Sequence, residues 1–135
     1  MKNSFKTPLV PISWGELIDK ITILEIKLKK LNTPSALLNV KNEYEYLINI
    51  IKFNFEIEEI IKQLKKDLLI VNELLWQVED DIRDKELNQS FDQQFIELAR
   101  KVYHLNDQRA NIKRQINKET NSELTEEKSY KKYSR

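Results

Sequence analysis

The chain has 135 residues, the length of one ordinary domain, and 33% of them are charged. It contains one glycine and no cysteine, which excludes a glycine-rich phosphate loop, a disulfide framework, a thiolate zinc site and a cysteine nucleophile. The formal net charge of +1 gives the whole protein no strong pull on nucleic acid. No apolar run is long enough for a signal peptide or a membrane span. We therefore expect a cytoplasmic protein that binds neither membranes nor nucleic acid.

The first predicted helix begins at Ser13. Ser13 and Glu16 form a capping box, in which the serine hydroxyl accepts from a first-turn amide and the glutamate reaches back to the serine amide. Apolar residues then recur at spacings of four and three through residues 17–31, and further isoleucines widen the stripe. This helix should therefore be buried on more than one side. Asn-Thr-Pro at 32–34 ends it, because proline suits the first position of a following helix.

The second and third predicted helices meet at an aromatic-rich connection. Residues 34–53 carry one apolar helical face, and Phe-Asn-Phe at 53–55 has weaker helix propensity, which indicates a bend or short connection. From about 56 to 87 the apolar residues follow an unbroken alternation of four and three that is typical of a coiled coil. This alternation is the strongest pattern in the sequence. It consists of Ile57, Ile61, Leu64, Leu68, Val71, Leu75, Val78 and Ile82.

A fourth predicted helix follows an interruption at residues 88–90. Ser90 is expected to cap it, with Gln93 three residues on, and the apolar stripe continues to Ile116. The third and fourth helices would each be roughly 40 Å long, and their connection of about three residues makes them antiparallel neighbours.

The predicted fold class is all-α. We expect an antiparallel bundle of three to four helices with a long C-terminal helical hairpin and a disordered tail, because the last residues are too polar to order themselves. The corresponding division is an N-terminal arm at 1–12, a helical bundle at 13–117 and a polar tail at 118–135. The first two helices are shorter than the last two, so part of the hairpin stripe lacks an internal partner. We expect a homodimer or a complex with another protein; the alternative is a compact monomer whose second helix continues past Phe55.

Arg109 interrupts the apolar stripe of the fourth helix, and a guanidinium there needs a partner. If the hairpin pairs symmetrically about its loop, Glu73 and Asn72 are the expected neighbours of Arg109. For the carboxylate that bonds to Arg109, Glu73 is the first candidate and Asp80 the second. We expect Arg109 to be at least half buried and bonded to a carboxylate. Two interpretations remain open: a pocket for an anionic ligand, or a salt-bridge network that fixes the register of the helices.

The start of the first helix adds further candidates. Trp14 either anchors the helix start in the core or lines an opening where Gly15 lets a backbone or a ligand approach closely. Glu16, Asp19 and Lys20 are explained as well by a solvated face as by a site.

The remaining residues supply no recognised catalytic centre. His104 is the only histidine, so a His-rich metal centre is excluded, and the Glu-x-x-His pattern of di-iron bundles does not occur. Glu-x-x-Glu at 56–59 and Asp-x-x-Asp at 81–84 imitate the magnesium blocks of helical nucleotide pyrophosphohydrolases only loosely. The sequence predicts no metal and no cofactor, and whether the protein is an enzyme stays open.

Four blocks of the sequence carry a resemblance to a known family. They are PISWGELIDKITILEIK at 11–27, VNELLW at 71–76, VYHLNDQR at 102–109 and EEKSY at 126–130. The chain resembles a small bacterial protein family of unknown function along nearly its whole length, and residues 32–66 match least. The resemblance implies a bacterial module without assigned activity that is loosely associated with surface-polysaccharide genes.

Motif positions of that family fall here on polar or aromatic residues that packing alone does not require, which favours a shared polar site. The first functional hypothesis is a helical interaction or accessory module without catalytic activity, linked to surface-polysaccharide processes. The alternative is a small enzyme or ligand-binding protein that acts on an anionic small molecule. An open pocket would favour the alternative, and a solidly packed bundle the first hypothesis. The candidate ligand-binding residues are Trp14, Glu16, Asp19, Lys20, Asn72, Glu73, Trp76, Tyr103, Asn106 and Arg109.

Overall fold

The structure is a computed structural model that describes residues 4–54 and 58–133. Helices make up 74% of this part of the chain and no strand occurs in it, which confirms the all-α prediction. The helices are α1 (Trp14–Lys30), α2 (Pro34–Asn54), α3 (Glu59–Leu87) and α4 (Gln93–Glu119). None of them is both long enough and apolar enough to traverse a lipid bilayer.

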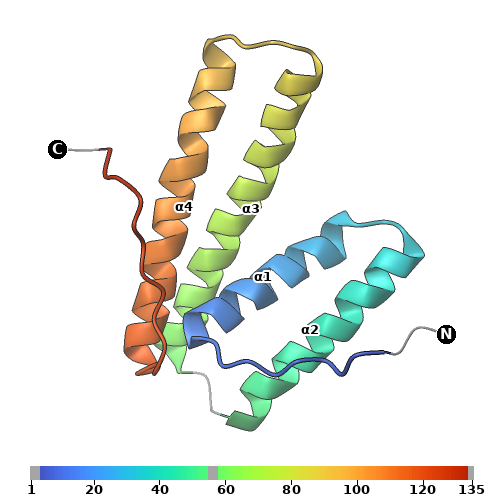
Figure 1. Ribbon diagram of the computed structural model, residues 1–135, viewed down its shortest axis with the longest axis vertical. Coiled ribbons are helices and arrows are strands. Elements are labelled where there is room, and N and C mark those ends of the chain that lie inside the picture. The colour runs from blue at the N-terminus through green and yellow to red at the C-terminus, as the bar shows by residue number, and fades with distance from the viewer. Residues whose placement is uncertain (1–3, 55–57, 134–135) are drawn as a thin grey trace.

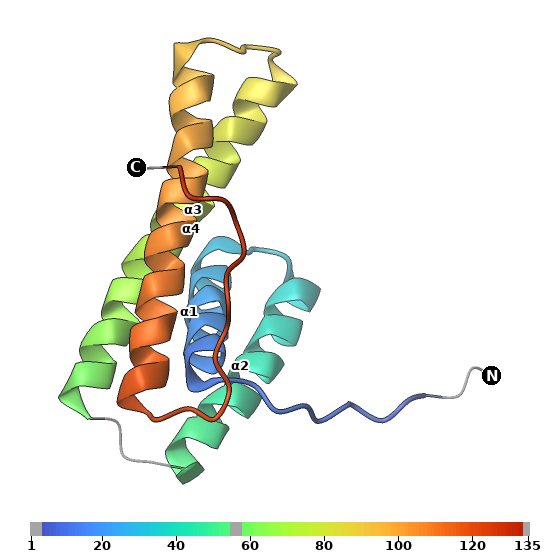
Figure 2. The ribbon, with the colours of Figure 1, turned by 60° about the vertical axis from the view of Figure 1, so that its left-hand side comes forward.

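Two antiparallel helical hairpins of unequal length form the fold (Figure 1). The α1–α2 hairpin is short, and the α3–α4 hairpin is long enough that its distal end extends beyond the short one (Figures 1 and 2). α1 packs against each of the other three helices. The proximal half of the long hairpin is therefore covered by α1, and the distal half packs mainly on itself.

The apolar stripes predicted from the sequence form two adjoining clusters. In the first, buried side chains of all four helices meet around Ile21, Leu68 and Ile116, each of which is fully buried. The second lies inside the long hairpin and joins Leu105 of α4 to α3. The predicted alternation along α3 is confirmed for Ile61, Leu64, Leu68, Val71, Leu75 and Val78, all of which are buried.

The predicted helix cap at Ser13 is confirmed, and the one at Ser90 is wrong. Ser13 Oγ accepts a 3.0 Å hydrogen bond from an amide in the first turn of α1. Gln89 adopts a positive φ of 52° just after α3, so the chain turns before it can restart a helix. α4 then begins after Asp92, whose carboxylate accepts a 3.0 Å hydrogen bond from the amide of Phe95. Asp92 therefore takes the capping role that was assigned to Ser90.

The second helix ends at Asn54, within the predicted connection. Residues 55–57, which include the Phe55 of that prediction and the Ile57 of the α3 stripe, lie outside the described residues. The division into an arm at 1–12, a bundle at 13–117 and a tail at 118–135 stays a prediction.

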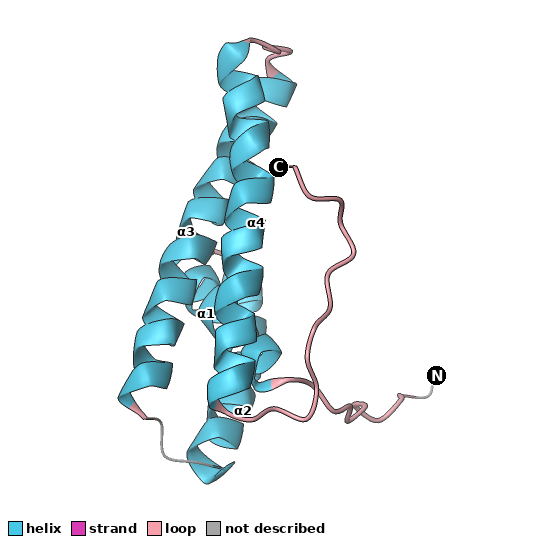
Figure 3. Cartoon of the chain, turned by 90° about the vertical axis from the view of Figure 1, so that its left-hand side faces the viewer, coloured by secondary structure: helices cyan, strands magenta, loops and turns pink. Residues whose placement is uncertain are grey.

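Residues 122–133 contain no helix or strand, as their polar composition predicts. The chain turns at Asn121, which has a φ of 50°, and this tail then runs back alongside α4 (Figure 3). Its side chains contact α4 at three places along the helix, so the tail covers one face of α4. The contacts are Glu126 with Lys113, Lys128 with Asp107, and Tyr133 with His104.

Candidate functional site

A buried ion pair joins α1 to α4. Arg109 Nε donates to Asp19 Oδ1 at 2.8 Å and Arg109 Nη2 donates to Asp19 Oδ2 at 2.5 Å, so the guanidinium grips the carboxylate with two prongs. The side chain of Asp19 is 1% exposed and that of Arg109 is 28% exposed. The hydrogen bonds to Asp19 raise the pKa of Arg109 above its usual value. The predicted burial of Arg109 and its bond to a carboxylate are confirmed.

The predicted partners of Arg109, Glu73 and Asp80, are wrong. Both are exposed on α3. The prediction assumed that α3 and α4 face only each other, whereas α1 packs against both of them and brings its own carboxylate to Arg109.

Asn72 of α3 connects a third helix to this pair. Its Nδ2 donates at 2.9 Å to Asp19 Oδ1 and at 2.9 Å to Thr22 Oγ1, and the Thr22 hydroxyl donates at 2.7 Å to the carbonyl of Asp19. Asn72 is 5% exposed and Thr22 is fully buried. In the part of the chain that the structure describes, every buried side-chain nitrogen or oxygen has a hydrogen-bond partner. The Asp19 network, Asp19 with Thr22, Asn72 and Arg109, therefore fixes α1, α3 and α4 relative to one another.

Lys113 lies one turn beyond Arg109 on α4. Its Nζ is 2.7 Å from Glu16 Oε2 of α1 and 2.7 Å from Glu126 Oε2 of the tail, and its side chain is only 8% exposed. Burial lowers the pKa of Lys113, but hydrogen bonds to Glu126 and Glu16 outweigh burial, and the pKa is raised. The predicted second half of the capping box is wrong, because the Glu16 carboxylate reaches Lys113 instead of the amide of Ser13.

The start of α1 lies directly against the backbone of α4. Gly15 N donates to Asn117 Oδ1 at 2.7 Å. A Cβ at Gly15 would lie 2.5 Å from the carbonyl oxygen of Lys113, closer than carbon and oxygen can approach. The glycine therefore permits a backbone approach. Trp14 packs against the first core cluster, which confirms that it anchors the helix start.

A pocket of about 1000 Å³ lies between α4 and the tail. Six cationic and three acidic side chains line it, so the pocket favours an anion. Arg109 binds Asp19 through the Nε–Nη2 edge of its guanidinium. The two N–H groups on Nη1 take no part in these bonds. Tyr103, Tyr130 and Tyr133 add aromatic surface to the lining.

The structure brings together seven of the ten candidate residues and separates three. Asp19, Asn72 and Arg109 form the Asp19 network; Glu16, Tyr103, Asn106 and Arg109 line the pocket; and Trp14 lies beside Glu16 at the start of α1. Lys20 Nζ instead points to α2, 3.7 Å from Glu43 Oε1. Glu73 is exposed and Trp76 is half-buried farther along α3.

Lys113, Asn117 and Glu126 were not among the residues predicted from the sequence. A signal for the first two was present, because Asn106, Arg109, Lys113 and Asn117 recur at spacings of three and four and so share one face of α4. Nothing in the sequence pattern of the tail places Glu126 beside Lys113.

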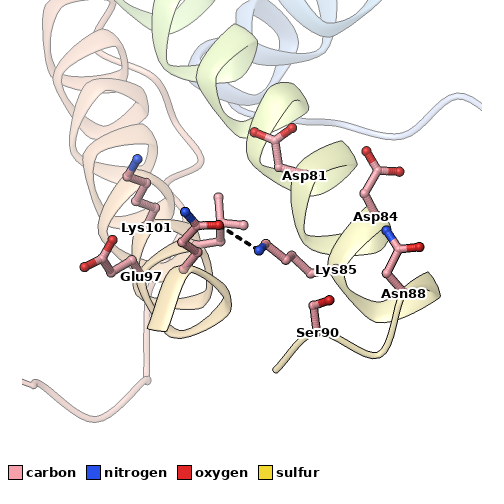
Figure 4. Close-up of a pocket in the computed structure, with 9 residues that line it drawn as sticks. Asp81, Asp84, Lys85, Asn88, Ser90, Glu97 and Lys101 are labelled. Atoms are coloured by element: carbon pink, nitrogen blue, oxygen red, sulfur yellow. Dashed lines mark hydrogen bonds between the residues drawn. The ribbon is translucent and has the colours of Figure 1, made fainter. Parts of the chain in front are cut away.

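A smaller pocket of about 450 Å³ lies at the distal end of the long hairpin (Figure 4). Lys85 of α3 reaches across it, with its Nζ 3.0 Å from Asp92 Oδ2 and 2.7 Å from Gln94 Oε1. Asp81, Asp84 and Glu97 also belong to the lining. Across residues 4–54 and 58–133, no three histidine, aspartate or glutamate side chains are grouped so that they could hold a metal ion.

Comparison with known proteins identifies a family. No curated protein and no solved structure matches the chain. The model of DUF6165, described as a family of unknown function, matches residues 9–134. This range contains all four helices, the Asp19 network and the pocket beside the tail. The chain therefore belongs to the DUF6165 family, whose function is unknown.

Proposed function

We propose that this protein is a non-catalytic binding module whose ligand is an anionic small molecule, held in the pocket between α4 and the tail. The observation that supports this proposal best is the placement of Arg109. Asp19 holds one edge of the guanidinium in a fixed orientation, and Arg109 lines a large pocket rich in cations. A preoriented guanidinium of this kind suits the planar, two-pronged binding of a carboxylate or phosphate.

The charge of the pocket supports an anionic ligand over a neutral one. Arg114, Lys131 and Lys132 add positive charge to the lining around Arg109 and Lys113. The tyrosines of the lining provide apolar contact area, which adds affinity for an anion that also carries an apolar part.

The surroundings of Asp19 favour binding over acid–base catalysis. Its carboxylate accepts hydrogen bonds from Arg109 and Asn72 and is 1% exposed. These partners shield the carboxylate from a ligand in the pocket, so it is not placed to exchange a proton with that ligand. Its role in the proposal is to position Arg109.

The test compares two arginines of α4. Arg109→Lys keeps a positive charge opposite Asp19 but loses the planar fork, whereas the matched control Arg100→Lys changes an exposed arginine that is not in the lining. Isothermal titration with inorganic pyrophosphate and with citrate should show binding to Arg100→Lys and at least about tenfold weaker binding to Arg109→Lys. Equal affinities in the two variants would contradict the proposal.

We also propose the self-association that the sequence predicts. The long hairpin supports it with exposed apolar side chains: Ile70 is 57% exposed and Leu74 is 49% exposed on α3. Light scattering at micromolar concentration should give twice the 16.2 kDa mass of one chain. A concentration-independent mass near 16.2 kDa would overturn it.

We propose a cytoplasmic location from the sequence, which has no apolar run long enough for a signal peptide, and a link to bacterial surface polysaccharides from the family resemblance alone. Affinity purification from the native bacterium should then enrich proteins of surface-polysaccharide synthesis. Enrichment of unrelated proteins only would remove this part of the proposal and leave the binding site unaffected.

A further inference from the structure

We infer that the tail is an internal competitor for the anion site: the Glu126 carboxylate occupies the position that the anionic group of the ligand takes beside Lys113. Ligand binding then displaces Glu126 from Lys113. This inference rests on the proposed function, because it concerns the regulation of the same pocket.

Arg109 and Lys113 of α4 have more carboxylate partners than they need to balance their charge. Arg109 is paired with Asp19, and Lys113 is paired with Glu16, so each cation already has one carboxylate from α1. Glu126 adds a third carboxylate, 2.7 Å from Lys113 Nζ. Because the α1 partners remain in place, removal of Glu126 leaves neither cation without a counterion.

Lys113 and Glu126 differ in burial. The Lys113 side chain is 8% exposed, whereas the Glu126 side chain is 52% exposed. A buried ammonium has few directions from which a further anion can approach, and Glu126 occupies one of them from the pocket side. An ion-pair partner that is half in solvent is held weakly by the pair itself. Glu16 is also 45% exposed, but it lies on α1, whereas Glu126 lies on a segment outside any helix, so an incoming anion can replace Glu126.

The contact between Glu126 and Lys113 shows an anionic group bound within the pocket lining. A carboxylate on an extended segment lies within hydrogen-bond distance of a lysine that lines the pocket. The structure thus shows the position where the carboxylate or phosphate of a ligand can reach Lys113, with Arg109 one turn away on the same helix. The electrostatic attraction of Arg109 to Glu126 is consistent with this closeness.

The test uses two neighbouring glutamates of the tail in the full-length chain. Glu126→Gln removes the competing charge, and Glu127→Gln removes the same charge from an exposed residue outside the lining. The two variants have equal net charge, so any difference between them is local. We expect inorganic pyrophosphate and citrate to bind Glu126→Gln about fivefold more tightly than the wild type, and Glu127→Gln within about twofold of it.

A second measurement follows Lys113 directly. The ¹⁵Nζ resonance of a buried, hydrogen-bonded ammonium reports the groups around it, so Glu126→Gln should shift the Lys113 signal and Glu127→Gln should not. Pyrophosphate added to the wild type should shift the same signal. Anion binding that is equal in the wild type and Glu126→Gln, or that leaves the Lys113 signal unchanged, overturns the inference and leaves the proposed function standing. Binding to none of the three proteins overturns both.

Discussion

Both ends of the long hairpin have an ion pair between a basic and an acidic side chain, but the two pairs differ in burial. At the proximal end, α1 covers the hairpin, and Asp19 is 1% exposed where it meets Arg109. At the distal end, no other helix in the described part of the chain covers the hairpin (Figure 2). There Lys85 pairs with Asp92, which is 51% exposed. The comparison shows that a buried ion pair fixes helices relative to one another, whereas an exposed ion pair contributes little to holding them together.

The two ends also differ in how far apart their partners lie in the sequence. Arg109 and Asp19 are 90 residues apart, and Lys113 and Glu16 are 97 residues apart. Lys85 lies seven residues from Asp92 and nine from Gln94. The proximal pairs therefore form only when the whole bundle is assembled, whereas the distal pairs need only the hairpin loop.

The largest expected effect is at Asp19. Asp19→Ala leaves Arg109 partly buried without its carboxylate, so the free energy of unfolding should fall by about 3 to 5 kcal/mol. The matched control at the distal end is Asp84→Ala, which removes an exposed aspartate and should change stability by less than about 0.5 kcal/mol. Urea denaturation followed by circular dichroism measures both. Similar losses in the two variants would remove the distinction between the ends.

Gly15→Ala should have the next largest effect. The new Cβ meets the backbone of α4 and forces α1 away from it, which should destabilise the protein by about 1 to 3 kcal/mol even though alanine is the better helix former. The same denaturation experiment tests it. An unchanged or raised stability would show that α1 can move without loss.

The distal ion pair should contribute little. Lys85→Met removes the pair with Asp92, and we expect a loss of at most about 1 kcal/mol that nearly disappears in high salt. Denaturation at low and high ionic strength gives the measurement. A larger loss that persists in salt would mean that the distal end is as tightly coupled as the proximal end.

The smallest expected effect is a pH dependence of the free energy of unfolding, which arises from Lys113 at the proximal end. The folded-state pKa of Lys113 is raised because its bonds to Glu126 and Glu16 outweigh burial, so its contribution is fully present below its unfolded pKa, near 10.5. That contribution is lost as the pH rises from there through the folded pKa. The wild type should therefore lose more stability than Lys113→Met between neutral pH and pH values above 10.5. Parallel pH profiles would contradict this assignment.

Most of the fold could be predicted because helical period and helix caps are local properties. The alternation along α3 identified its buried residues, and Ser13 identified the start of α1. The wrong cap at Ser90 shows the limit of local reasoning, because two polar residues, Ser90 and Asp92, compete within one short loop. No residue pattern in the sequence predicts the positive φ of Gln89, which delays the start of α4.

Only part of the candidate site could be predicted, because the side chains that bond to one another come from distant segments of the chain. Arg109 was identified from one helix, since a charge within an apolar stripe requires a counterion. The choice of Asp19 over Glu73 depends on how α1 packs against the hairpin, and helical period does not encode that packing. The involvement of Glu126 depends on the path of a segment with no periodicity at all.

The contact of Gly15 with α4 has a consequence for synthesis. The amide of Gly15 is satisfied by Asn117 and that of Trp14 by Ser122 at 3.3 Å, partners that lie 102 and 108 residues further along the chain. A ribosome synthesises the first helix long before those partners, so the first turn of that helix stays exposed to water until residues 117 and 122 have been made. Ribosome-bound chains halted before residue 117 should therefore leave the first turn of the nascent helix open to hydrogen exchange, whereas the released and folded protein should protect it.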